Sequence, residues 1–237
     1  MRLMILALLA ALPATGSAQS VPQTAPAAPA AAPALDPAWK VPEVLAFIGV
    51  KPGDKVADVV GGRLTGSLAR AVGPTGKVYA VETAEVVKVH PEVLTMMHGL
   101  AAQAPNVVVS ADPVMTPLPQ GLDVVFIRQN YHDLYDKFMG PADVGAFDRQ
   151  VYVALKPGGV YVVLDHVAAA GSGIGATETL HRIDPERVKA DALAAGFKFD
   201  GESKILANPA DDHVKNVFDP GIRGHTDQFL FRFRKPK

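Results

Sequence analysis

The feature that most constrains the fold is residues 55–82, which read K-V-A-D-V-V-G-G-R-L-T-G-S-L-A-R-A-V-G-P-T-G-K-V-Y-A-V-E. Two apolar runs, 55–60 and 77–81, flank a segment with helical apolar spacing at 65–72. Continuously apolar strands are buried on both faces, and two strands joined through a helix pair in parallel. We therefore predict an α/β fold, a mostly parallel sheet with helices on both faces. Its ligand site should lie where the strands end.

A glycine pair and two acids mark that edge of the predicted sheet. Gly61 and Gly62 follow the first strand, where the lack of a Cβ lets the backbone come close to a ligand. Glu82 closes the second strand, 24 residues after Asp58, near the spacing at which a carboxylate binds both ribose hydroxyls in nucleotide-binding α/β folds. The simpler alternative is a tight turn followed by a solvated acid.

The N-terminal region is expected to lie outside the folded domain. Residues 1–18 combine Arg2, an apolar run at 3–12 and small residues before Gln19, a pattern that predicts a signal peptide cleaved after Ala18. Residues 19–35 are almost entirely Ala and Pro, a composition typical of a linker. Residues 36–237 then form one domain of ordinary size. We expect an exported protein, periplasmic or secreted.

Composition excludes several kinds of partner and site. The chain has no cysteine, so it has no disulfide and no thiolate metal site. Its 23 basic and 24 acidic residues nearly balance, which argues against a nucleic-acid partner, because phosphate binding needs a basic face. The apolar run at 3–12 is too short to span a bilayer, so no stable membrane insertion is expected after signal cleavage.

The strand and helix pattern continues to the C-terminus. The chain is expected to form seven strands in all, with one antiparallel strand at the sheet edge. Further strands are predicted at 106–110, 122–127, 160–164, 197–206 and 227–234, and helices at 84–103 with a break at Pro91, at 142–155 and from 185 to about 195. Asp112 stands just beyond the third strand. The polar segment 208–226 is long enough to form a flap over the site, and we expect its polar groups to cap its own turns.

Six motifs in order carry a resemblance to a known family: V-A-D-V-V-G-G, V-G-P-T-G-K-V-Y-A-V-E, N-Y-H-D-L, L-K-P-G-G-V-Y-V-V-L-D-H, T-L-H-R-I-D-P and N-P-A-D-D-H-V-K-N-V-F-D-P-G-I-R-G-H-T-D-Q-F. Over essentially all of residues 36–237, the chain resembles an exported family of predicted methyltransferases in the class I S-adenosylmethionine-dependent superfamily. The resemblance implies a Rossmann-like class I methyltransferase fold and methyl transfer to an unknown small-molecule acceptor. The first motif departs from the superfamily pattern acid-x-Gly-x-Gly-x-Gly, because Val60 and Leu64 stand at glycine positions.

The resemblance also implies a cofactor, S-adenosyl-L-methionine, and residues that contact it. Asp58, Gly61 and Gly62 would line its methionine and sugar side, Glu82 would bind the ribose hydroxyls, and Asp112 would bind the adenine amine. One alternative is an exported, non-catalytic protein of the same fold that binds a small molecule or partner. A nicotinamide-dependent oxidoreductase is a weaker alternative, since the spacing G-x-G-x-x-G is missing after the first strand.

Four polar residues follow the fourth and fifth predicted strands: His132, Asp133, Asp165 and His166. Neighbouring strand ends meet at one edge, so we expect an acid–base cluster in which His132, neutral near pH 7, removes a proton from the acceptor. The alternative is that Asp133 caps a turn and His166 is a satisfied polar group. His181, His213 and His225 could join a metal site, but no H-x-x-x-H or H-E-x-x-H spacing occurs, so no metal site is predicted.

Overall fold

The computed structural model describes residues 35–140 and 142–237, and Leu35–Lys237 form one compact unit. The predicted signal peptide and all of the predicted linker except Leu35 lie outside the described residues. Among the residues described, no helix has both the length and the apolar character needed to cross a membrane.

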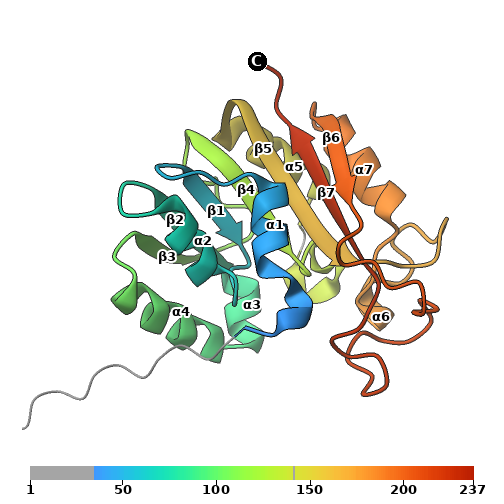
Figure 1. The fold of residues 1–237 in the computed structure, drawn as a ribbon. Helices are drawn as coiled ribbons and strands as arrows, with labels where there is room; N and C mark the ends of the chain where they lie inside the picture. The colour runs from blue at the N-terminus through green and yellow to red at the C-terminus, as the bar shows by residue number, and fades with distance from the viewer. Residues whose placement is uncertain (1–34, 141) are drawn as a thin grey trace, which may run out of the picture. The chain divides into compact units, whose positions relative to one another are not determined.

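A seven-stranded sheet forms the centre of the domain (Figure 1), with the strand order β3-β2-β1-β4-β5-β7-β6. The strands are β1 (Lys55–Val59), β2 (Lys77–Thr83), β3 (Val107–Asp112), β4 (Leu122–Arg128), β5 (Leu155–His166), β6 (Lys198–Ser203) and β7 (Gln228–Arg234). The first five strands pair in parallel, and β7 pairs antiparallel with both β5 and β6. The predicted mostly parallel α/β sheet is confirmed.

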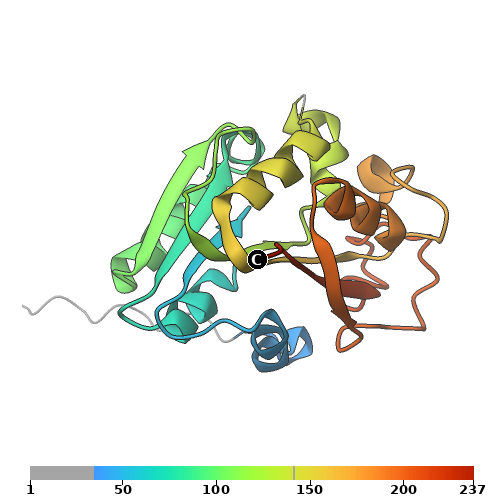
Figure 2. The same cartoon turned by 90° about the horizontal axis from the view of Figure 1, so that it is seen from above.

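Helices cover both faces of this sheet, as the view from above shows (Figure 2). They are α1 (Val41–Ile48), α2 (Thr65–Val72), α3 (Ala84–Val89), α4 (Glu92–Gln103), α5 (Val144–Ala154), α6 (Thr177–Leu180) and α7 (Pro185–Ala194), with short 3-10 helices η1 (Pro37–Trp39), η2 (His132–Tyr135) and η3 (Lys137–Met139). The break predicted at Pro91 separates α3 from α4. One apolar cluster joins α1, α2 and α4 to the sheet, and a second joins α5 and α7 to its opposite face.

The antiparallel strand is not at the edge of the sheet, contrary to our expectation. β7 lies between β5 and β6, and β6 is the edge strand. Phe229, Leu230, Phe231 and Phe233 of β7 are buried, whereas no residue of β6 is. An apolar strand such as β7 is stabilised by neighbours on both sides, while a half-polar strand tolerates the edge.

The strand order reverses beside β1, because β2 lies on one side of it and β4 on the other. From β1 the chain passes through α2 to β2, on one side of β1. It later runs from β3 to β4, which lies on the other side of β1. In open α/β sheets a crevice forms at this switch point, outside the carboxyl ends of the strands. The ends of β1 and β4 therefore define where a ligand site should be.

Candidate functional site at the carboxyl ends of the strands

A cleft of about 440 Å³ lies at this switch point. It is lined by Gly61 and Gly62 after β1, by Glu82 of β2, and by Arg128, Gln129 and Asn130 at the end of β4. The other lining residues are Trp39, Asp58, Val60, Arg63, Leu64, Val86, His90, Val93, Met96, His166, Val217, Phe218, Arg223, Gly224, Thr226 and Gln228. Four of the five residues predicted to contact a cofactor thus lie around one cavity.

Among these four residues, Glu82 gives the clearest indication of a bound ligand. Its side chain is fully buried, and neither carboxylate oxygen has a hydrogen-bond partner among the described residues. Burial, together with the nearby charge of Asp58, raises the pKa of Glu82 to about 8. The alternative of a solvated strand end is therefore wrong. A buried carboxyl group without partners is costly unless a ligand supplies the missing donors.

Gly61 lies directly against this carboxyl group. A Cβ built on Gly61 would come within 3.4 Å of Glu82 Oε1 and 3.0 Å of Met97 Cε. A side chain at position 61 would thus crowd the space beside the carboxylate. At Gly62 a Cβ would meet nothing within 4 Å, so this residue faces open space in the cleft.

Asp58 holds the turn after β1. Thr65 Oγ1 at the start of α2 donates to Asp58 Oδ2 at 2.5 Å, and the backbone N–H of Gly62 donates to Thr65 Oγ1 at 3.2 Å. Burial raises the pKa of Asp58 to about 6, although hydrogen bonding to Asp58 from Thr65 and from the backbone of Gly62, and the charge of Arg128, oppose the rise. The main role of Asp58 is therefore structural, because it fixes the conformation of the turn that contains Gly61 and Gly62.

Two residues at the cleft have left-handed backbone conformations that usually favour glycine. Val60 has φ +48° and Gln129 has φ +57°. Val60 occupies one of the glycine positions of the superfamily pattern, and its left-handed backbone is one that glycine adopts without strain. Such strain costs on the order of 1–3 kcal/mol and concentrates at functional sites.

An aromatic and cationic wall closes one side of the cleft. The guanidinium of Arg128 lies 4.8 Å from the ring centre of Trp39, and that of Arg63 lies 5.5 Å from it. Burial lowers the pKa of Arg128 to about 10, so Arg128 remains charged near neutral pH. This wall favours an anionic group of a ligand. The acidic residues Asp58 and Glu82 line the same cleft.

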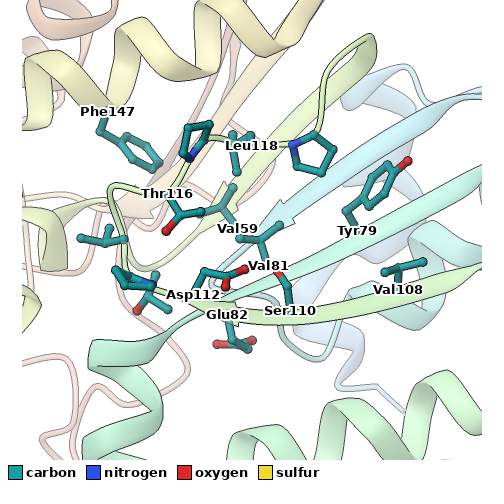
Figure 3. Close-up of a pocket in the computed structure, with 15 residues that line it drawn as sticks. Val59, Tyr79, Val81, Glu82, Val108, Ser110, Asp112, Thr116, Leu118 and Phe147 are labelled. Carbon is teal, nitrogen blue, oxygen red and sulfur yellow. The ribbon is translucent and has the colours of Figure 1, made fainter.

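Asp112 does not line the cleft. It is exposed at the end of β3 and borders a second cavity of about 320 Å³, on the sheet face that α5 covers (Figure 3). In the register of β2 and β3, Ala111 is the partner of Glu82, and Asp112 is the partner of Thr83. Figure 3 shows the side chain of Glu82 directed away from the other labelled residues of that cavity. The expected contact of Asp112 with an adenine amine stays a prediction.

The four residues predicted as an acid–base cluster do come together. Asp165 holds His132 at two points, because its Oδ1 lies 2.8 Å from His132 Nδ1 and its Oδ2 accepts from the His132 backbone N–H at 2.9 Å. His132 Nε2 lies 3.1 Å from Asp133 Oδ1. The rings of His132 and His166 are 6.3 Å apart between centroids. Asp133 faces His132 and His181, so the turn-capping alternative is wrong for Asp133, whereas His166 is a satisfied polar group through its contact with Thr226.

The two histidines of this cluster differ in protonation. Burial alone would lower the pKa of His132, but the charges and hydrogen bonds of Asp165 and Asp133 outweigh it and raise that pKa to about 10. Burial lowers the pKa of His166 to about 3, and the positive charges nearby add to this effect. His132 is therefore protonated, unlike the neutral base expected from sequence, whereas His166 is neutral. Only His166 lines the cleft, with its Nδ1 2.7 Å from Thr226 Oγ1.

Residues 208–226 form the flap that the sequence predicted, and five of its residues line the cleft. Its polar side chains cap its own turns, as Asn208 does for Ala210 and Asp219 does for Gly221. Sequence reasoning missed its anchor, Arg182, which is fully buried and bonds both oxygens of Asp211 at 2.8 and 3.1 Å. Arg182 stands inside the motif T-L-H-R-I-D-P, but nothing in the sequence shows which acid it meets.

Comparisons with known proteins identify the fold. No protein-family model and no curated protein matches the chain in sequence. Among solved structures, a SAM-dependent methyltransferase from Aquifex aeolicus is 18% identical, with a TM-score of 0.56 over 82% of this chain and 88% of that one. The N-methyltransferase NodS from Bradyrhizobium japonicum is 13% identical, with a TM-score of 0.56 over 84% and 96%. The [4+2]-cyclase SpnF is 18% identical, with a TM-score of 0.59 over 84% and 80%. The chain therefore has the Rossmann-like fold of class I methyltransferases, and the cyclase shows that other chemistry occurs on it.

Proposed function

We propose that this protein is an S-adenosyl-L-methionine-dependent methyltransferase that acts on a small-molecule acceptor. The observation that carries the proposal is the carboxyl group of Glu82, buried without partners at the end of β2 and beside Gly61. A vicinal diol provides two donors for two acceptor oxygens, and a ribose presents such a diol. The class I methyltransferase fold of solved neighbours supports the same reading.

The rest of the cleft fits the other parts of this cofactor. Val86, Val93 and Met96 form an apolar wall against which a purine ring can pack. Arg63 and Arg128 match the carboxylate of the methionine part, and Asp58 offsets their charge. When bound, the cofactor supplies an electrophilic methyl group on a sulfonium. The cleft's own residues then need only hold the two reactants in line and keep water out.

His166 is the group that we assign to the acceptor. Its neutral ring lies at the cleft and is held by Thr226, so it can accept a hydrogen bond from a hydroxyl or amine and orient it. Asn130 also lines the cleft and offers an amide to the same ligand. Tyr131 faces away, because its hydroxyl donates to Asp148 in the core at 2.8 Å. His132 and Asp133 do not line the cleft, so they would act on the acceptor only through His166.

Calorimetric titration of the full chain with S-adenosylmethionine and S-adenosylhomocysteine tests the proposal. We expect both to bind, and Glu82→Gln to weaken binding by about 1.5–3 kcal/mol, the range for a hydrogen bond to a charged group. Glu186→Gln, on the exposed surface of α7, is the matched control and should bind as the parent does. Unchanged affinity in Glu82→Gln would exclude the ribose assignment. No binding by the folded parent would favour the non-catalytic alternative.

The proposal includes the place where the protein works. The signal-peptide pattern of residues 1–18 supports export, to the periplasm or the outside. A small-molecule acceptor is supported by the size of the cleft, which is that of a ligand pocket, and by the near balance of basic and acidic residues, which disfavours nucleic acid.

A further inference from the structure

A second group of side chains lies next to the cleft and joins His132 and Asp133 of the acid–base cluster to His181. His181 Nδ1 lies 3.8 Å from Asp133 Oδ1, the same oxygen that lies 3.1 Å from His132 Nε2. These three atoms all lie within 4.8 Å of one another. His132 and Asp133 begin η2, whereas His181 caps the end of α6, so only the packing of α6 on η2 brings them together.

We propose that His132, Asp133 and His181 form a binding site for a divalent first-row transition metal such as Zn²⁺. Two imidazoles and one carboxylate are a ligand set that Zn²⁺ and Fe²⁺ use, with further positions left open to water or substrate. Bond lengths near 2.1 Å place neighbouring ligand atoms about 3.4 Å apart around a tetrahedral ion. The two distances of 3.1 and 3.8 Å lie on either side of that value.

The surroundings of His132 support this assignment. Its Nδ1 is held by Asp165 Oδ1, which leaves Nε2 directed at the other two ligands. A carboxylate behind a histidine is the usual outer partner of a metal ligand, because it fixes the ring orientation and raises the basicity of the ligating nitrogen. Asp165 is itself fixed by the backbone N–H groups of His132 and His166.

Negative charge is concentrated around the same point. Asp133, Asp136 and Asp165 are all buried, and Asp136 Oδ1 has no hydrogen-bond partner among the described residues. A doubly charged cation here would displace the proton that His132 carries beside Asp133, and the buried carboxyl groups would compensate its charge.

The backbone conformation of His181 and its contacts also support a metal site. His181 has φ +54°, a left-handed conformation that is unusual for residues other than glycine and that gathers at ligand sites. Its ring packs edge-on against Phe218 of the flap at 5.0 Å between centroids, and Phe218 and His166 both line the cleft. A metal at this point would thus adjoin the acceptor side of the cleft.

Metal binding by the full, untagged chain tests the proposal. After dialysis against a chelator, we expect one equivalent of Zn²⁺ to bind and to remain through gel filtration in elemental analysis, and Co²⁺ to give the intense visible absorption of a low-coordinate site. His181→Asn should weaken Zn²⁺ binding at least tenfold, because it removes a ligand while Asn tolerates the left-handed backbone.

His213→Asn is the matched control. His213 also has a left-handed backbone, at φ +63°, and also contacts a carboxylate, Asp227 at 3.0 Å, but it lies outside the cluster. Its Zn²⁺ affinity should equal that of the parent. Asp133→Asn is a second ligand variant, with circular dichroism used to verify that each chain is folded. A folded parent without stoichiometric binding overturns the site, as does binding that His181→Asn and Asp133→Asn leave unchanged. Neither result depends on S-adenosylmethionine, so the proposed function is tested separately.

Discussion

Arg182 and Asp211 form a bidentate ion pair with both side chains almost fully buried, and this pair fastens the flap to the sheet. Arg182 also donates to the backbone carbonyl groups of Val167, after β5, and Lys215, in the flap. Asp211 accepts from the backbone N–H of Asp227, where the flap returns to β7. One guanidinium thus links both ends of a long polar segment that borders the cleft.

We predict that Arg182→Met destabilises the folded protein by about 3–5 kcal/mol, the usual cost of leaving one partner of a buried ion pair uncompensated. Chemical denaturation measures this free energy of unfolding. Arg187→Met is the matched control, since Arg187 pairs with Asp191 on α7 with 43% of its side chain exposed. It should cost less than about 1 kcal/mol. Equal effects of the two substitutions would mean that the buried pair has no special role.

The raised pKa of Glu82 predicts a pH-dependent stability. The folded protein holds this proton up to about pH 8, whereas the unfolded chain releases it near 4.5. The stability that protonated Glu82 contributes is therefore complete below about pH 4.5 and is lost as the pH rises through 8. A tenfold change in proton affinity corresponds to about 1.4 kcal/mol, so Glu82→Gln should be more stable than the parent by about 2 kcal/mol or more at pH 8.5.

Thermal unfolding from pH 5 to pH 9, without ligand, measures this difference. Its magnitude should shrink toward pH 5, where both chains carry a neutral group at position 82. Glu186→Gln, which replaces an exposed acid, should show no such trend. A stability difference between Glu82→Gln and the parent that stays constant with pH would contradict an acid of raised pKa.

Ligand binding at the same carboxyl group should also depend on pH. Hydroxyl donors favour the ionised form of Glu82, so binding lowers its pKa and releases a proton. The affinity for S-adenosylhomocysteine should therefore rise as the pH increases from 6 to 8. Calorimetry in buffers of different ionisation enthalpy measures the released proton. Glu82→Gln should lose this part of the proton release, and an unchanged release would assign it to another group.

Trp39 is the only tryptophan of the chain, and it lines the cleft within contact of Arg63 and Arg128. It is partly exposed, so a ligand that covers its ring should shift its fluorescence to shorter wavelength. Titration with S-adenosylmethionine should give a saturable shift with the calorimetric affinity. Trp39→Phe should abolish the signal while calorimetric binding persists. A calorimetric response without any change in Trp39 emission would place the ligand elsewhere.

The sequence by itself determined the type of fold and most of the residues at one edge of it. A continuous apolar run is favourable as a strand when both of its faces are buried, as in a parallel sheet. The local pattern therefore predicted the sheet, and with it the positions of Asp58, Gly61 and Glu82. The pairing of His132 with Asp165 was also within reach, because adjacent parallel strands end at the same edge.

Tertiary structure decided what depends on distant contacts. Burial without hydrogen-bond partners raised the pKa of Glu82. Two carboxylates, one at each ring nitrogen of His132, made this side chain a cation where the free side chain would be neutral. Asp112 lies in register with Thr83 and so lies apart from the cleft, which no spacing along the chain could show. His181 joins Asp133 only because α6 packs on η2. Sequence pattern records which face of an element is apolar, but protonation and ligand sets depend on distances between side chains that only the folded chain brings together.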